Sequence, residues 1–270
     1  MEPTNTKNPL NLPMAIVIAG ILIAGAIFLR GSGKTDSEPD KPVAVQPSPA
    51  LGAITLRPVD AARDHIRGNP DADIMFVEFS DTECPFCKRF HGVMQQLMSE
   101  YGKSGKVAWV YRQYPIVQLH SKAPKEAEAL LCAAELGGNE KFWDYTDRLY
   151  TLTNSNDSLD PSNLPRIATD VGLNEGLFMD CLSSGRQQPR VKSDFDDGVA
   201  AGVQGTPHSV LVLKTPLSAK SRTAILAHME QYRDQNGDLP VSFSLDGLRV
   251  GLNGALPYQS VKATVDALLK

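Results

Sequence analysis

Several kinds of protein are excluded by what this 270-residue sequence lacks. It has no excess of basic residues, since 27 Lys and Arg stand against 31 Asp and Glu, for a formal net charge of -4. Binding to nucleic acid phosphates needs clustered Lys and Arg, so a nucleic acid is not an expected partner. No internal repeat is visible, and a hydrophobic content of 42% excludes a chain that is disordered throughout.

Cysteine is also scarce, with four residues in the whole chain, Cys84, Cys87, Cys132 and Cys181. An even number allows two disulfides, provided that the compartment is oxidising. The N-terminal sequence indicates which compartment the protein occupies.

The first 30 residues contain a long uncharged run, MAIVIAGILIAGAIFL at positions 14–29. At about 1.5 Å per residue this run alone falls short of the roughly 30 Å hydrocarbon core, so flanking apolar residues have to contribute. We expect residues 1–30 to form an uncleaved signal-anchor that contacts the lipid bilayer through residues 14–29. The alternatives are a buried helix and a cleaved signal peptide, since Ala24-Gly25-Ala26 resembles a cleavage site.

Residues 31–55 have the composition of a linker. Positions 31–50 contain four Pro, three Ser and two Gly, and such a stretch cannot bury enough apolar surface to offset its ordering entropy. The rest of the chain, residues 56–270, is predicted to be one domain.

The most informative segment of that domain is a strand followed by a helix. Residues 74–79 are apolar at both parities except for Glu78, which predicts a strand covered on both faces. Cys84-Pro85-Phe86-Cys87 comes next, and apolar residues then recur every three or four positions up to Tyr101. The strand therefore delivers Cys84 to the start of a helix in an α/β fold.

A cysteine at a helix start has distinctive chemistry. Unpaired backbone N–H groups and the helix dipole both favour a thiolate there, so the pKa of Cys84 should be low and its sulfur nucleophilic. Pro85 fits the first helical turn. Cys87, one turn further on, can resolve a mixed disulfide between Cys84 and a substrate.

A single C-x-x-C motif has other interpretations. A zinc site would need a second ligand pair, and Cys132 and Cys181 stand 49 residues apart without a C-x-x-C or H-x3-5-H partner. No metal ligand is therefore assigned. The other alternative is a structural disulfide between Cys84 and Cys87 with no turnover.

The motifs together resemble the DsbA family of thioredoxin-fold thiol-disulfide oxidoreductases. The resemblance covers most of the domain. It rests on HIRGNPDADIMFVEFSDTECPFCKRFH from His65, on RQYP from Arg112, on LCAAE from Leu131, on Gly205-Thr206-Pro207 and on NGALPY from Asn253. It implies a thioredoxin-like fold with a helical insertion at about 120–203.

The resemblance also implies roles for particular residues, with Cys84 and Cys87 as the redox pair. Glu78 matches a buried acid that exchanges protons with the inner cysteine, although a strand-end Glu that reaches solvent is the alternative. Thr206-Pro207 matches a loop with a cis-proline that binds extended substrate. Pro85 and Phe86 lie in the same substrate-binding surface, and Phe86 replaces the His of the strongly oxidising members.

Some relatives close a second disulfide in the helical insertion, which implies a structural Cys132–Cys181 bridge, with two buried free thiols as the alternative. Helices are predicted at 124–136 and at 140–150, the second with Asn139 as its cap. The strands at 209–213 and 248–252 should pair, separated by an extra insertion at about 214–247. His120 and Trp109 are interpreted as structural residues.

The sequence therefore predicts a membrane-tethered thiol-disulfide oxidoreductase on the extracytoplasmic, periplasmic side of a single-pass anchor. Its expected partners are cysteine-containing exported polypeptides and a redox partner that recycles it, and no cofactor is implied. Oxidase is the favoured direction, and isomerase or reductase is the alternative. Two further hypotheses are a zinc-binding module and a redox-inert peptide-binding protein.

Overall fold

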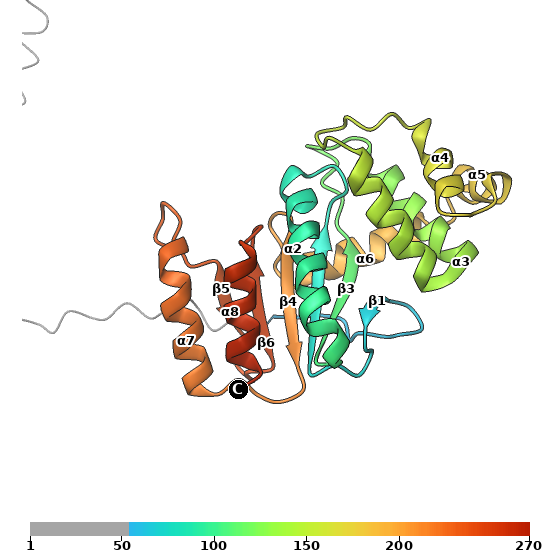
Figure 1. Cartoon of the computed structure of the whole chain (residues 1–270). Helices are drawn as coiled ribbons and strands as arrows, with labels where there is room; N and C mark the ends of the chain where they lie inside the picture. The colour runs from blue at the N-terminus through green and yellow to red at the C-terminus, as the bar shows by residue number, and fades with distance from the viewer. Residues whose placement is uncertain (1–53) are drawn as a thin grey trace, which may run out of the picture. The chain divides into compact units, whose positions relative to one another are not determined.

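A computed structural model describes residues 54–270 of the protein (Figure 1). The expected signal-anchor at 1–30 and almost all of the expected linker at 31–55 lie outside the described residues. Within 54–270, no helix combines the length and the apolar character that crossing a membrane would require.

The described residues form a mixed α/β fold. Its strands are β1 (His65–Gly68), β2 (Ile74–Ser80), β3 (Val107–Gln113), β4 (His208–Leu213), β5 (Val241–Phe243) and β6 (Arg249–Asn253). Its α-helices are α2 (Pro85–Tyr101), α3 (Ala123–Leu152), α4 (Asn163–Asp170), α5 (Glu175–Ser184), α6 (Gln188–Ala200), α7 (Ala219–Met229) and α8 (Tyr258–Leu268), with short 3-10 turns η1 (Gly102–Ser104) and η2 (Glu230–Tyr232).

The strands make one six-stranded sheet in the order β1-β3-β2-β4-β6-β5. β2 and β3 are parallel, and the other neighbours are antiparallel. All seven residues of β2 are buried, which confirms the prediction of a central strand covered on both faces. The predicted pairing of 209–213 with 248–252 is also confirmed, with Ser209 opposite Leu252.

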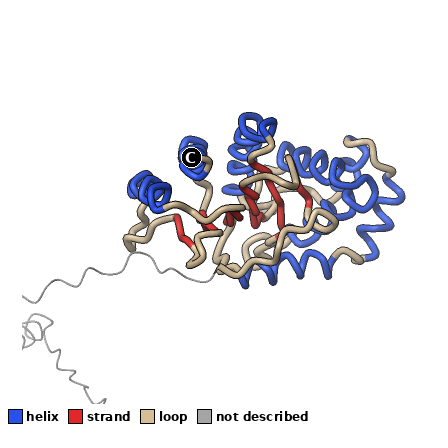
Figure 2. Tube along the Cα trace, turned by 90° about the horizontal axis from the view of Figure 1, so that it is seen from below, coloured by secondary structure: helices blue, strands red, loops and turns tan. Residues whose placement is uncertain are grey.

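Alternate residues of β2 face two separate hydrophobic layers. Ile74 and Phe76 belong to the layer that contains the buried face of α2, whereas Val77 and Phe79 belong to the layer on the other face of the sheet. Phe195 of α6 packs against that second layer. Figure 2 shows helices on both sides of the strands. Packing on both faces fixes the position of β2. Cys84 follows the end of β2 by four residues, so its position is fixed as well.

The helix α3 is interrupted where the sequence predicts a boundary between two helices. Gly137 and Gly138 have non-helical backbone angles, and Gly138 has a φ of 71° that favours glycine. The prediction that Asn139 caps the second half is wrong. Its side chain instead pairs with the backbone of Ile66 in β1, accepting from the N–H at 2.8 Å and donating to the carbonyl at 2.7 Å.

The extra insertion at about 214–247 folds as α7, η2 and β5. Ile225 and Met229 of α7 are buried, and α7 lies beside α8 (Figure 1). β5 pairs with β6 and forms one edge of the sheet. The insertion therefore extends the sheet at the end away from β1.

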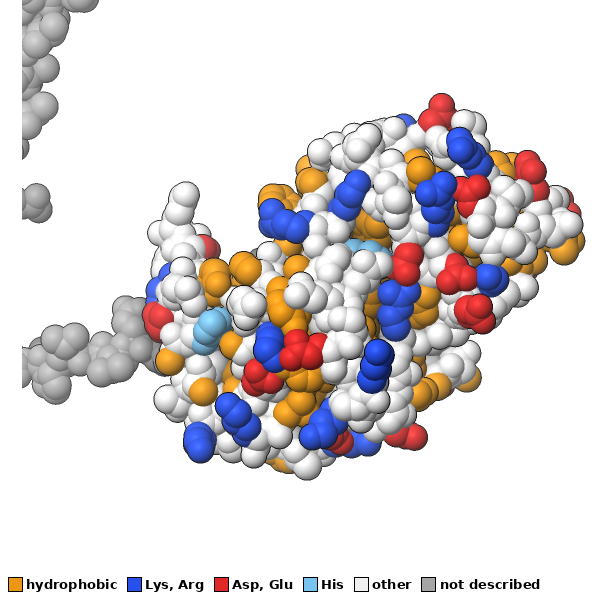
Figure 3. All heavy atoms as spheres, in the orientation of Figure 1, with side chains coloured by type: hydrophobic (Ala, Val, Ile, Leu, Met, Phe, Trp, Pro, Cys, Tyr) orange, Lys and Arg blue, Asp and Glu red, His pale blue; other side chains and the backbone are white. Residues whose placement is uncertain are grey.

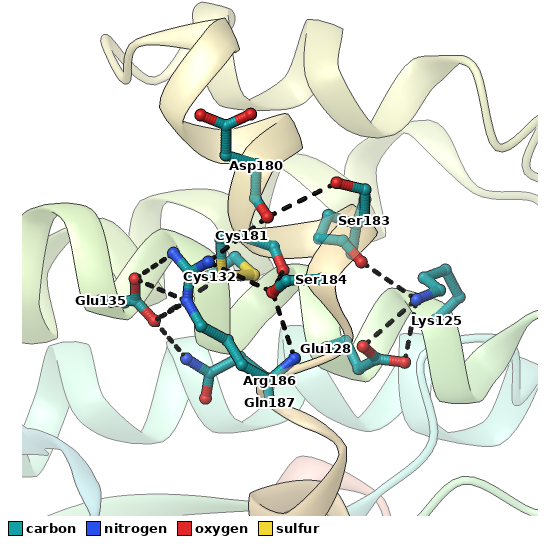
Figure 4. Close-up of a disulfide and its surroundings, with 11 residues drawn as sticks. Lys125, Glu128, Cys132, Glu135, Asp180, Cys181, Ser183, Ser184, Arg186 and Gln187 are labelled. Atoms are coloured by element: carbon teal, nitrogen blue, oxygen red, sulfur yellow. Dashed lines mark hydrogen bonds and ion pairs between the residues drawn. A yellow bond between two sulfur atoms is a disulfide. The ribbon is translucent and has the colours of Figure 1, made fainter.

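Cys132 of α3 and Cys181 of α5 are joined by a disulfide, with a Cα–Cα distance of 5.8 Å. Figure 4 shows polar side chains around it. The guanidinium of Arg186 and the amide of Gln187 both donate to the carboxylate of Glu135, at 2.5 and 2.6 Å. The bridge and these hydrogen bonds connect α3 to the segment from α5 to α6.

Candidate active site

The loop after β2 places Cys84 at the N-terminus of α2. Cys84 is the N-cap residue, with extended backbone angles, and Pro85 occupies the first helical turn, where no partner for a backbone N–H is needed. Both thiols are free. Both are buried, but Cys84 is 5% exposed and lines a cleft whereas Cys87 is fully buried, so Cys84 is the more accessible of the two.

The two cysteines have opposite acidities. A hydrogen bond from the Cys87 thiol, supported by the backbone N–H groups of Cys87 and Phe86, lowers the pKa of Cys84 to about 6. Burial raises the pKa of Cys87 well above its ordinary value, and the nearby Cys84 sulfur raises it further. At pH 7 Cys84 is therefore mostly thiolate and Cys87 is a thiol.

The loop before β4 packs against this pair. The peptide bond between Thr206 and Pro207 is cis, and the Sγ of Cys84 lies 3.4 Å from the carbonyl oxygen of Thr206. Pro207 is buried and Thr206 is half-buried. The structure thus brings together Cys84, Cys87 and Thr206-Pro207 from segments that are about 120 residues apart in the chain.

Glu78 lies in the middle of β2 and is fully buried. Trp109 of β3 donates its indole N–H to Oε2 of Glu78 at 2.9 Å, while Oε1 has no hydrogen-bond partner among the described residues. Burial raises the pKa of Glu78 to about 7. The alternative of a strand-end Glu that reaches solvent is therefore excluded.

A cleft of about 450 Å³ opens beside Cys84. It combines apolar side chains with amide and imidazole groups. The lining residues are Cys84, Pro85, Phe86, Ile116, Leu119, His120, Asn156, Gln204, Gly205 and Thr206.

The surface around the cleft is apolar and basic. Phe86 is 54% exposed, and the Arg89 guanidinium lies 5.2 Å from the centre of its ring. Figure 3 shows hydrophobic side chains next to Lys and Arg side chains where α2 begins. An apolar polypeptide segment fits such a surface.

His120 has a closer relation to the site than the sequence indicates. It is buried, its Nδ1 lies 3.0 Å from the Asp81 carboxylate, and it lines the cleft. Burial opposes a charge on the ring, but the Asp81 hydrogen bond and the Cys84 sulfur raise the pKa of His120 overall. A positive charge here favours the Cys84 thiolate, a contribution that Phe86 cannot make.

Buried acids surround the start of α2. The Asp81 carboxylate also accepts from the backbone N–H groups of Glu83 and Ile116, at 2.9 and 2.8 Å. Glu83 is fully buried directly before Cys84. Burial, together with the neighbouring Glu83 carboxylate, raises the pKa of Glu126 to about 8. Glu126 is therefore mostly protonated at pH 7.

Three residues to which the sequence assigns no role in the chemistry thus lie at the site. Trp109 donates to Glu78, His120 faces the cleft, and Asn156 lines its rim. Asn156 is 72 positions from Cys84 and belongs to no motif. Only the folding of the helical insertion back over α2 brings it there.

Within residues 54–270, no group of three or more His, Cys, Asp or Glu side chains has the arrangement to hold a metal ion.

Comparison with known proteins gives a family and a fold. A family model described as thioredoxin matches residues 60–215, which is more than half of the chain. The chain is 34% identical over 165 residues to the Na(+)/H(+) antiporter NhaA 1 of Mycolicibacterium gilvum, and 35% identical over 157 residues to NhaA 3 of Salinispora tropica. The matches cover 60% and 58% of this chain but 25% and 23% of those proteins, so the chain spans about a quarter of the length of these relatives.

The fold is also that of several solved structures. Pseudomonas aeruginosa DsbA2 superimposes with a TM-score of 0.54 at 20% identity, over 75% of this chain and 93% of that one. BdbD from Bacillus subtilis gives 0.57 at 16% identity, over 78% and 96%. Wolbachia pipientis α-DsbA1 gives 0.54 at 21% identity, over 76% and 90%.

The fold class expected from the sequence is thereby confirmed for the described residues, as a thioredoxin-like α/β fold with a helical insertion. The chain belongs to the thioredoxin family, and its described residues have the same fold as the solved DsbA2, α-DsbA1 and BdbD structures.

Proposed function

We propose that the chain oxidises pairs of thiols in exported polypeptides through the Cys84–Cys87 couple. One observation carries this proposal. The sulfur of Cys84, which lines a cleft and has a pKa of about 6, lies beside the buried thiol of Cys87 and the Thr206 carbonyl. A low thiol pKa, a resolving cysteine and an adjacent peptide-binding edge are what disulfide exchange requires.

The reaction begins from the oxidised enzyme. A substrate thiolate attacks Sγ of Cys84, the Cys84–Cys87 bond breaks, and Cys87 leaves as a thiolate and takes up a proton. A second substrate thiolate then attacks the substrate sulfur of the mixed disulfide and expels Cys84. The substrate loses two electrons and two protons. The enzyme gains both electrons, one proton is kept on Cys87, and the other goes to solvent because Cys84 stays a thiolate. The low pKa of Cys84 makes it a good leaving group in the second step.

Glu78 is proposed as the group that exchanges the proton with Cys87. The Glu78 carboxyl contributes to the raised pKa of Cys87, and with a pKa of about 7 it is divided between its two forms at neutral pH. It can therefore give a proton to the leaving Cys87 and take one back when the pair is reoxidised.

The sign of the Cys84 pKa shift favours the oxidising direction. Stabilising the thiolate stabilises the reduced enzyme, and a pKa of about 6 in place of 9 raises the reduction potential at pH 7 by about 30 mV. A second, oxidised protein, membrane-bound or extracytoplasmic, would have to accept the two electrons from the dithiol. Reductase or isomerase action is the alternative that a potential near that of thioredoxin, roughly -270 mV, would support.

We further propose that residues 14–29 anchor the chain in a membrane with the catalytic domain on the extracytoplasmic side. The uncharged run and the Cys132–Cys181 disulfide, which is typical of an oxidising compartment, support this placement. Alkaline extraction of membranes and protease protection test it. An anchored protein stays with the membrane and is digested only from the extracytoplasmic side.

Trapping of mixed disulfides tests the enzymatic proposal. Cys87→Ser, incubated with a disulfide-containing polypeptide, should accumulate a covalent adduct through Cys84, because nothing resolves it. Cys84→Ser should form little adduct, since Cys87 is buried and stays protonated. Equal adducts in the two variants, or none in either, would contradict the proposal.

A further inference from the structure

The loop between α3 and α4 contains an unusual turn. Ser155, Asn156 and Asp157 have φ angles of 67°, 56° and 61°, and within residues 54–270 they are the only non-glycine residues with a positive φ. A side chain at a positive φ contacts its own backbone, so such residues persist only where the surrounding structure holds them. Three in succession indicate that the turn is held strongly.

Glu83, the residue before Cys84, is hydrogen-bonded to several residues of this turn. Its buried carboxylate accepts from the hydroxyl of Thr153 at 3.0 Å and from the backbone N–H groups of Ser158 and Leu159, both at 3.3 Å. Its backbone carbonyl accepts from the N–H of Asn156 at 2.7 Å. Glu83 thus binds both ends and the centre of the turn.

A second set of hydrogen bonds ties the turn to the segment after His120. The Asp157 carboxylate accepts from the N–H and the hydroxyl of Ser121, at 2.8 and 2.7 Å, and from the N–H of Lys122 at 3.0 Å. The ammonium of Lys122 donates to the Asp157 carbonyl at 2.6 Å. The turn is therefore fixed to two segments that line the cleft beside Cys84.

These contacts place Asn156 on the cleft. Asn156 is exposed and lines the same cleft as Cys84 and Thr206, and its amide makes no hydrogen bond to any described residue. An exposed amide offers both a donor and an acceptor, which is what the backbone of an extended polypeptide can pair with.

We propose that Asn156 is a substrate-binding residue that hydrogen-bonds the backbone of the polypeptide substrate, and that Glu83 is a positioning residue that holds it at the rim. This inference rests on the proposed function. It assigns to the helical insertion a direct part in binding the substrate, next to the Thr206-Pro207 edge.

Asn156→Gly provides the most discriminating test, because glycine tolerates the positive φ and keeps the turn while removing the amide. We expect KM for a reduced, unfolded polypeptide to rise about three- to tenfold. The rate with a small dithiol and the pKa of Cys84 should stay unchanged, since neither involves Asn156. Asn154→Ala, an exposed change in the same loop, is the matched control and should leave KM unchanged.

Glu83→Gln tests the positioning role. The variant presents an NH2 group to one of the N–H donors of the turn, so we expect KM for the polypeptide to rise to a similar extent relative to KM for the small dithiol. A change in the reactivity of Cys84 alone would leave that ratio unchanged. Glu140→Gln makes the same chemical change at an exposed position and should have no effect. Addition of Glu83→Gln to Asn156→Gly should raise KM little further if both act through one contact.

The outcomes separate this inference from the proposed function. If Asn156→Gly and Asn154→Ala have the same KM for the polypeptide in an active enzyme, the substrate-binding role of Asn156 is wrong. If the unmodified protein exchanges disulfides with neither the polypeptide nor the small dithiol, the proposed function itself is wrong.

Discussion

Trp109 donates its indole N–H to a carboxylate oxygen of Glu78 at 2.9 Å, and both residues are completely buried. The indole supplies one hydrogen bond, whereas an ionised carboxylate in the same place would need several. Burial therefore dominates, and the pKa of Glu78 rises to about 7. The protein retains an acid that titrates at neutral pH next to its redox pair.

This acid should make stability depend on pH. The folded protein holds the Glu78 proton up to about pH 7, whereas the unfolded chain releases it near 4.5. The free energy of unfolding therefore falls as pH rises from about 4.5 to 7, by about 3 kcal/mol in total from this group. Glu78→Gln should lose that part of the slope.

Urea denaturation of the oxidised forms checks this, because neither Cys84 nor Cys87 titrates in a disulfide. We subtract the unfolding free energy of the unmodified protein from that of Glu78→Gln. This difference should be more positive at pH 8 than at pH 4.5, because only the unmodified protein loses stability over this range. A difference that is the same at both pH values would show that Glu78 titrates normally in the folded state.

A second prediction concerns the thiol of Cys87. Its hydrogen bond is the largest cause of the low pKa of Cys84, so Cys87→Ala should raise the pKa of Cys84 by about one unit or more. Cys87→Ser keeps a hydroxyl donor and should raise it less. The rate of alkylation of Cys84 as a function of pH measures both. A midpoint that stays near 6 in both variants would show that the Cys87 hydrogen bond does not cause the low pKa.

The Cys132–Cys181 bridge is expected to stabilise the domain without taking part in turnover. It closes a loop with a sequence separation of 49 residues, and its removal in Cys132→Ala/Cys181→Ala should lower the free energy of unfolding by about 2–4 kcal/mol. Dithiol oxidation by the folded variant should be unchanged. A loss of activity under conditions where the variant remains folded would argue that the bridge has a redox role.

A buried arginine joins the segment before β1 to α6. The Arg112 side chain is fully buried and forms ion pairs with Asp64 at 2.9 Å and Asp197 at 2.5 Å. Arg112→Met leaves two carboxylates without their main partner and should cost about 3–5 kcal/mol of unfolding free energy.

Arg148→Met is the matched control, because it breaks a partly exposed ion pair with Asp170 and should cost less than about 1 kcal/mol. Similar losses for the two variants would mean that the Arg112 network contributes no more than a surface pair.

The pattern of the sequence predicts the parts of this fold that depend on local periodicity. The strand at 74–79, the helix after Cys84 and the break at Gly137-Gly138 all follow from apolar spacing and glycine. Asn139 could not be placed in the same way. An Asn before a helical pattern is typical of a cap, but β1 offers it two backbone partners that no local rule reveals.

The residues of the active site likewise fall into those that the sequence predicts and those that only tertiary packing places. Cys84 and Cys87 are recognisable because the motif is contiguous, and Thr206-Pro207 because the resemblance supplies its place. Asn156 and His120 reach the cleft only through the packing of the helical insertion on α2. Their side chains carry no signal in the sequence, because the hydrogen bonds that orient them come from residues about 40 to 70 positions away.

The acidity of Cys84 tests the whole account most directly. Thiolate absorbance near 240 nm, followed from pH 4 to 10 in the reduced protein and corrected with Cys84→Ser, gives its pKa. We predict a midpoint near 6. A midpoint near 9, the ordinary value for a cysteine thiol, would contradict the proposal that this sulfur is activated for disulfide exchange.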